Sequence, residues 1–273
     1  MALGDGYNGS VVKSESKIVF SLFLGLVKFP FIFLLALFGR RSFKDAFLPF
    51  RIFFKSLFEP KLTVFIIFLL FFCFVLSFIF IDFFDLFVLY PSDIFSLRFF
   101  SILTHGFLHG GVAHLLGNVL FIYVFGRVLE SELGSKKFII IYFFGLFFAA
   151  IFSSIVNLIL GVGVGGIGAS GALMALISAS IILRPFYFTY IFLIPLPVFL
   201  IGWVALYSDI SGILGGVDEG IGYFAHVGGF LSVFVLFYFL FKGDYKHLLK
   251  KGLLVNLATF IIFGVLYVVF FLK

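Results

Sequence analysis

Long apolar runs dominate the pattern of hydrophobic and polar positions along this chain. A membrane helix needs about 20 mostly apolar residues, and seven runs meet or approach that length. They cover residues 62–81, 112–130, 138–160, 170–184, 187–207, 223–241 and 253–272. The run at 170–184 is the shortest and follows a glycine-rich loop. Because lipid satisfies no backbone hydrogen bonds, we expect every span to be an α-helix.

The composition also indicates an all-α polytopic membrane protein. Hydrophobic residues make up 63% of the 273 positions and charged residues 12%, against about 25% charged in ordinary soluble chains. So few charges cannot cover a water-facing surface, and no stretch suggests a large soluble domain. The single cysteine, Cys73, excludes an intrachain disulfide and a Cys-based zinc site.

Basic residues fall in alternate loops, which sets the expected orientation. Lys and Arg collect on the cytoplasmic side, and here they cluster at 40–61, at 136–137, at 184 and at 242–251. The alternate loops are acidic and would face outward. An integral membrane protein with its site open to the extracytoplasmic side is therefore expected.

The first 60 residues are harder to place. Residues 18–38 are apolar, but Lys28 and Pro30 interrupt them, and residues 43–58 mix Phe with basic side chains. A cleaved signal peptide there would export the basic cluster, and a further full span would place Lys13 outside. We therefore expect residues 18–58 to lie at the membrane surface or to re-enter it.

Polar side chains at membrane depth are costly and mark function by default. Here they concentrate in three segments, at 98–118, 161–179 and 222–230. Four of the five histidines lie in these segments. The polar side chains of interest are His105, His109, His114, Asn118, Ser170 and His226.

These residues match the requirements of acyl transfer. His114 and Asn118 are four apart, so they share one helix face. Ser170 opens a short helix behind glycines, where backbone N–H groups lack partners. His226 lies near the outer end of its span. Together they could supply a nucleophile, a general base and donors for an oxyanion.

Other interpretations exist for each feature. A serine after glycines is commonly a helix N-cap, and a glycine run commonly serves packing. His105 and His109 could contribute to a metal site, but HExxH is missing and carboxylates near them are scarce. The GxGxxG at 161–166 lacks the strand and acidic residue of a dinucleotide site. Ala172 removes the GxSxG of soluble hydrolases.

Four motifs occur in order with apolar spans between them: HGGVAHLLGN at 109–118, GRVLESELG at 126–134, GASG at 168–171 and GYFAHVGG at 222–229. Together they resemble the motifs of the rhomboid family of intramembrane serine proteases. The resemblance covers residues 62–241 and implies a six-helix core, with residues 253–272 as one extra C-terminal transmembrane helix.

The resemblance also implies roles for single residues. Ser170 would be the nucleophile and His226 the general base of a Ser–His dyad. His114, Asn118 and the backbone N–H of Ser170 would hold the oxyanion. His105 and His109 would shape the loop. The remaining supporting residues are Glu130, as a structural partner, and Gly168, Gly171, Gly222 and Gly229.

Two departures from the family pattern bear on the site. Members often carry Trp-Arg where this chain has Phe100-Ser101, with Arg98 slightly upstream, which leaves the anchoring of loop 82–111 open. Met174 stands where several members have an aromatic residue against the base. Methionine is soft enough to pack on an imidazole, so we expect an altered orientation with activity retained.

The expected chain has an N-terminal cytoplasmic or interfacial segment (1–61), a rhomboid catalytic core (62–241), and a basic loop with a seventh helix (242–273). The expected partners are the lipid bilayer and transmembrane protein substrates, with no nucleic acid, cofactor or metal. A catalytically silent relative that binds membrane clients is the alternative. A transporter would need ionisable residues in several facing spans. Pro195, Pro197 and Gly202 could give the fifth span a lateral gate.

Overall fold

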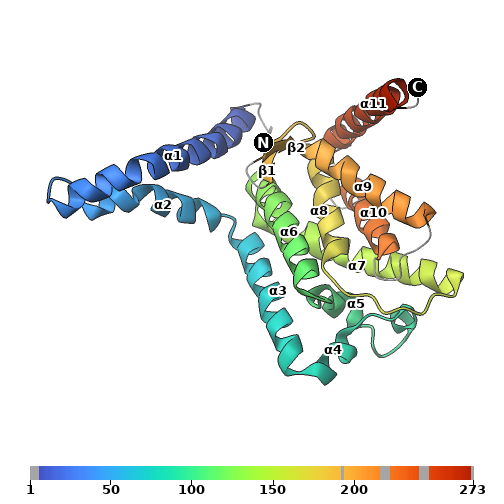
Figure 1. Cartoon of the computed structure of the whole chain (residues 1–273). Helices are drawn as coiled ribbons and strands as arrows, with labels where there is room; N and C mark the ends of the chain where they lie inside the picture. The colour runs from blue at the N-terminus through green and yellow to red at the C-terminus, as the bar shows by residue number, and fades with distance from the viewer. Residues whose placement is uncertain (1–5, 192–193, 216–221, 240–245, 272–273) are drawn as a thin grey trace. The chain divides into compact units, whose positions relative to one another are not determined.

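The computed structural model describes residues 6–191, 194–215, 222–239 and 246–271. Within them the chain is mostly helical, with eleven α-helices and one two-stranded sheet (Figure 1). The chain divides into two compact units, Met1–Lys61 and Leu62–Lys273.

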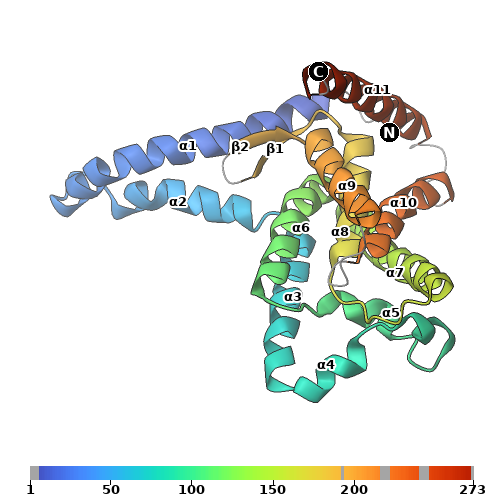
Figure 2. The same ribbon diagram turned by 45° about the vertical axis from the view of Figure 1, so that its right-hand side comes forward.

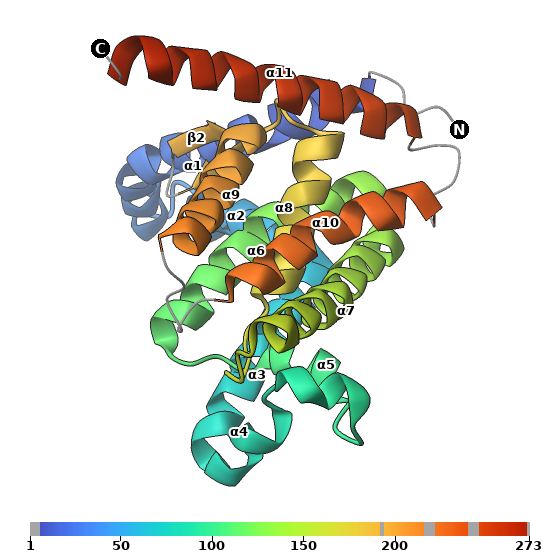
Figure 3. The ribbon, with the colours of Figure 1, turned by 90° about the vertical axis from the view of Figure 1, so that its right-hand side faces the viewer.

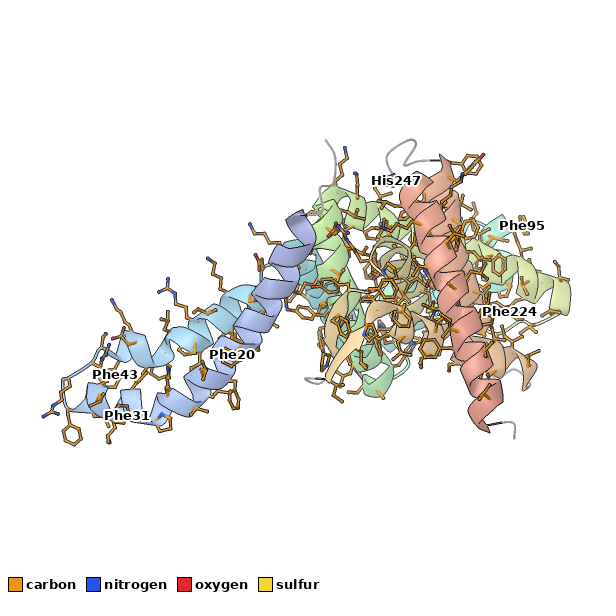
Figure 4. All side chains as sticks on the ribbon, turned by 90° about the horizontal axis from the view of Figure 1, so that it is seen from above. Phe20, Phe31, Phe43, Phe95, Phe224 and His247 are labelled. Carbon is orange, nitrogen blue, oxygen red and sulfur yellow. The ribbon has the colours of Figure 1, made fainter. Side chains whose placement is uncertain are left out.

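The first unit is a helical hairpin. Helix α1 (Gly6–Leu37) and helix α2 (Phe43–Leu57) pack together through ring contacts such as Phe29 with Phe47. Helix α1 runs through Pro30 and α2 through Pro49, and an internal proline costs a helix about 3 kcal/mol. Figure 4 shows Phe20, Phe31 and Phe43 on this hairpin, and all three are exposed. A position at the membrane surface stays a prediction.

The second unit contains the remaining elements. In chain order they are α3 (Lys61–Ile79), α4 (Ile81–Phe87), η1 (Pro91–Phe95), α5 (Ser101–Thr104), η2 (His105–Phe107), α6 (Val112–Leu133), α7 (Ser135–Leu160), α8 (Ser170–Leu183), β1 (Phe188–Ile191), β2 (Ile194–Pro197), α9 (Val198–Leu214), α10 (Tyr223–Phe239) and α11 (Lys246–Phe271). The two labelled η are short 3₁₀ turns.

Among the described residues, α3, α6 and α7 are long and apolar enough to cross a membrane, and α8, α9 and α10 are apolar but shorter. Helix α3 buries residues at helical spacing, such as Ile66, Leu70 and Phe74, while Phe68 and Phe72 are exposed. An exposed apolar face of this kind belongs in lipid. These helices indicate an integral membrane protein, whereas the count of seven spans stays a prediction.

Helix α8 lies at the centre of the second unit. Every residue from Gly171 to Leu183 is buried, because α6, α7, α9, α10 and α11 all pack against it (Figure 1). Small residues allow the close approach: Gly145 of α7 lies directly against Ala175. A helix buried on all sides needs no polar face, which explains the uniformly apolar sequence of α8.

The expected fifth helix at 187–207 is wrong in its first half. Phe188 pairs with Pro197 in an antiparallel hairpin of β1 and β2, and α9 starts only at Val198. Pro195 and Pro197 lack the N–H that a helix needs, while Thr189 and its neighbours favour extended backbone. The two prolines therefore do not interrupt a helix as the gate hypothesis requires.

Gly202 does lie in α9, and it serves packing. A Cβ there would stand 2.6 Å from Cγ2 of Ile181 in α8.

Helix α11 begins at Lys246, seven residues before the expected span at 253–272. Asn256 Nδ2 donates to the carbonyl oxygen of Ile181 (2.9 Å), and Figure 3 shows α11 crossing that end of α8.

Candidate active site

Ser170 is the first residue of α8, and the loop before it is held in place. Leu89 and Gly166 exchange two backbone hydrogen bonds of 3.1 and 2.7 Å. The Gly168 N–H donates to the carbonyl oxygen of His105 (2.9 Å). Figure 2 shows this loop passing beside α5. The segment between α3 and α6 thus fixes where α8 starts.

His114 and Asn118 of α6 face that loop. A Cβ on Gly168 would stand 2.8 Å from both Cε1 and Nε2 of His114 and 4.0 Å from Nδ2 of Asn118. Gly168 also has φ +112°, a conformation that favours glycine. Asn118 is buried, and its amide donates to the His114 carbonyl oxygen (3.0 Å). The two side chains therefore lie against the backbone two residues before Ser170.

Helix α10 reaches the same end of α8. Its Gly229 lies directly against the backbone of Gly171, and the Ala225 carbonyl oxygen is 3.7 Å from the Cβ position of Gly171. His226 lies next to Ala225 and one turn before Gly229, and Ser170 adjoins Gly171. Gly222 accepts a backbone hydrogen bond from His226 at the start of α10 (3.1 Å).

Asp209 is a site residue that the sequence analysis missed. His226 Nδ1 lies 2.8 Å from Asp209 Oδ1, and Asp209 is only 6% exposed. The expected fifth span ended at 207 and left Asp209 in a loop, whereas α9 continues to Leu214. Asp209 is the first acidic residue after Glu132, and this isolation beside an apolar run was the available signal.

His105 and His109 lie in the loop that precedes α6. His105 Nδ1–H donates to the Ser101 carbonyl oxygen (2.9 Å), and the His109 ring packs edge-on against His114, with centroids 5.0 Å apart. Both rings are buried. Burial lowers the pKa of His105 to about 4, and burial with the nearby His114 charge lowers the pKa of His109 to about 4. Both rings are therefore neutral at pH 7.

Arg98 anchors the loop between α3 and α6. Its Nη2 donates to the carbonyl oxygens of Asp85 and Val88, each at 3.0 Å, and its Nε lies 3.5 Å from Asp93 Oδ1. Asp93 in turn accepts a hydrogen bond from Ser101 Oγ (3.2 Å). The chain thus holds this loop through Arg98 and Ser101, although it lacks Trp-Arg at positions 100–101.

Glu130 joins three helices at the far end of α6. Its carboxylate accepts from the Leu62 N–H (3.0 Å), from the N–H and hydroxyl of Thr63 (2.9 and 2.8 Å) and from Ser135 Oγ (2.7 Å). It therefore satisfies donors at the N-terminal ends of α3 and α7. Glu130 lies twelve residues along α6 from Asn118, about 18 Å away, so its contacts are remote from the candidate site.

Met174, one turn after Ser170, is buried in the hydrophobic core. In the part of the chain that the structure describes, no three His, Cys, Asp or Glu side chains are grouped to hold a metal ion.

Comparison with known protein families matches residues 96–243 to the Rhomboid domain. RHOMBOID-like protein 1 of Arabidopsis thaliana is 36% identical over 147 residues, which are 53% of this chain and 36% of that protein. RHOMBOID-like protein 12, mitochondrial, of the same plant is 27% identical over 166 residues, 55% of this chain and 49% of that protein. The matches thus span less than half of either relative. The domain match covers more than half of the chain and all four motifs, and the chain therefore belongs to the rhomboid family.

Proposed function

We propose that the chain is an intramembrane serine endopeptidase that hydrolyses peptide bonds in or near transmembrane segments of other membrane proteins. One observation carries the proposal: α6 and α10, remote in sequence, both meet the start of α8. His114 lies against Gly168, and Gly229 lies against Gly171. Ser170 stands between these two glycines and is partly exposed.

In this mechanism Ser170 Oγ attacks the scissile carbonyl carbon while His226 takes its proton. The same imidazole then gives the proton to the leaving amine. Water hydrolyses the resulting acyl-enzyme, with His226 again as the base. These steps need Nε2 of His226 to face Ser170, because Nδ1 already has Asp209 as its partner.

The oxyanion would be held by three groups at the start of α8. The Ser170 N–H, in the first turn of a helix, has no intrahelical acceptor. Asn118 uses one amide hydrogen for the His114 carbonyl oxygen, which leaves the second for the substrate. The His114 ring provides the third donor. Together they stabilise charge that appears only in the transition state.

The proposed core comprises α3, α6, α7, α8, α9 and α10, with α11 as the extra C-terminal helix. The basic residues near the Arg184 end of α8 support a cytoplasmic location for that end, with Ser170 open to the extracytoplasmic side. A protease must bind its substrate as an extended strand. Suitable substrates are therefore membrane segments that Gly, Pro or polar residues unwind near their outer end.

The test is cleavage of a model single-span substrate by the purified full chain in detergent. Ser170→Ala and His226→Ala are compared with Ser178→Ala, whose hydroxyl on the same helix has no hydrogen-bond partner among the described residues. The proposal expects cleavage by wild type and Ser178→Ala and none by the two site variants. Equal cleavage by Ser170→Ala would refute it. Binding of the substrate without cleavage by any sample would instead favour a silent, client-binding protein.

A further inference from the structure

His226 has a partner beyond the predicted dyad. Its Nδ1 lies 2.8 Å from Oδ1 of Asp209. Asp209 comes from α9 and His226 from α10, so the contact links two helices. At this distance the imidazole donates its Nδ1–H to the carboxylate. The lone pair of the neutral ring is then on Nε2, the nitrogen that a general base must turn toward Ser170.

The buried surroundings of Asp209 make its contact with His226 costly in free energy. Asp209 is the only charged residue of α9, and its side chain is 8% exposed. Among the residues that the structure describes, its second oxygen, Oδ2, is buried without a hydrogen-bond partner. A buried ion pair often adds no stability over apolar side chains of similar volume. A buried carboxylate with a hydrogen-bond partner for only one of its two oxygens contributes little to holding two helices together.

Helices α9 and α10 also have another contact. The Tyr223 ring of α10 lies directly against Gly212 of α9, less than one turn beyond Asp209. The packing of the two helices therefore does not depend on the carboxylate. What the carboxylate adds is control of one imidazole, by fixing both the plane of the ring and the nitrogen that carries the proton.

We propose that Asp209 is a positioning residue that acts on catalysis through His226, so that the site works as a Ser170–His226–Asp209 triad. This inference rests on the proposed function. Asp209 accepts the Nδ1–H bond and stabilises the imidazolium that forms when Nε2 takes the proton of Ser170. It touches neither the substrate nor the reacting atoms.

The test compares wild type with Asp209→Asn, which keeps the size of the side chain and leaves no buried charge. An amide can donate to Nδ1 and so favour the wrong tautomer. We expect kcat to fall by about 10²–10⁴-fold, with KM and the melting temperature in detergent close to wild type. Labelling of Ser170 by a fluorophosphonate should slow by a similar factor. Asp45→Asn, on the exposed start of α2, is the matched control and should change nothing.

A spectroscopic measurement separates positioning from a structural role. In nitrogen-15 NMR spectra, the His226 signals are assigned by their absence from the spectrum of His226→Ala. Wild type should show the tautomer protonated at Nδ1, and Asp209→Asn should show a mixture or the Nε2 form. An unchanged tautomer, or a kcat that falls only with the folded fraction, would overturn the positioning role.

The two proposals fail in different ways. If Ser170→Ala is inactive while Asp209→Asn keeps the wild-type kcat, only the positioning role is wrong. If wild type neither cleaves the substrate nor takes the label, the protease and the triad are both refuted.

Discussion

Gly229 of α10 lies directly against the backbone of Gly171 in α8, with no room for a Cβ between the two helices. This contact brings His226 to the helix end that begins with Ser170. Backbone-to-backbone packing through small residues is a common way for membrane helices to approach closely. The distance between the proposed base and nucleophile thus depends on two residues that have no side chain.

Replacing Gly229 with alanine should separate α8 from α10 and lower activity. The added methyl group would overlap backbone atoms, which cannot move aside as a flexible side chain can. We expect a destabilisation of about 1–3 kcal/mol and a larger proportional loss of cleavage, measured by thermal unfolding and by kcat. Gly117→Ala is the control, because a Cβ there meets nothing within 4 Å. Wild-type activity in Gly229→Ala would contradict the packing argument.

Replacing Asn118 with alanine should slow cleavage without abolishing it. Loss of one oxyanion donor costs about 3–4 kcal/mol in the transition state, which corresponds to a fall in kcat of roughly 10²–10³-fold with a small change in KM. The Ser170 N–H and His114 would still act on the oxyanion. Steady-state kinetics of Asn118→Ala provide the measurement, and a kcat equal to wild type would remove Asn118 from the site.

Two buried histidines should make the fold sensitive to mild acid. Burial lowers the pKa of His105 and His109 to about 4 in the folded chain, against about 6.5 when unfolded. Between these values the unfolded state binds more protons, so stability is full above pH 6.5 and falls as the pH drops toward 4. Each ring contributes up to about 1.4 kcal/mol per pH unit in that window.

Thermal unfolding from pH 7.5 to 4 measures this dependence. Replacing both histidines with asparagine should flatten the curve, because the unfolded chain would then gain fewer protons. A melting temperature that rises as the pH falls would show that the sign of the argument is wrong.

Replacing Arg98 with lysine should loosen the loop that positions the nucleophile. The guanidinium reaches three carbonyl oxygens and Asp93 together, and a lysine ammonium cannot reproduce that fork. We expect a loss of about 1–3 kcal/mol and reduced cleavage. Proteolysis within residues 82–111 should become faster. Arg40→Lys, in the first unit and exposed, should match wild type in both measurements.

The sequence predicted best the helices whose apolar runs are long enough to cross a membrane. The expected spans at 112–130 and 138–160 correspond to Val112–Leu133 and Ser135–Leu160. Hydropathy located helices but not their ends. Helix α11 begins at Lys246, although the sequence analysis assigned the basic residues at 242–251 to a loop. The hairpin before α9 was missed because apolar runs do not distinguish strand from helix.

The site was predictable only in part, for a related reason. Motif spacing pointed to Ser170, His114 and His226, but contacts between remote segments are absent from a linear pattern. Asp209 was overlooked because the apolar run stops two residues before it, while the helix does not. The four hydrogen bonds of Glu130 depend on three helices meeting, which no local rule provides.

The central claim is that Ser170 is a nucleophile activated by His226. Its most direct test is labelling of the purified full chain with a fluorophosphonate, followed by mass spectrometry to locate the adduct. The account predicts an adduct on Ser170 in wild type and little or none in His226→Ala, with His247→Ala as the control. An adduct absent from Ser170 in wild type, or formed equally fast in His226→Ala, would contradict it.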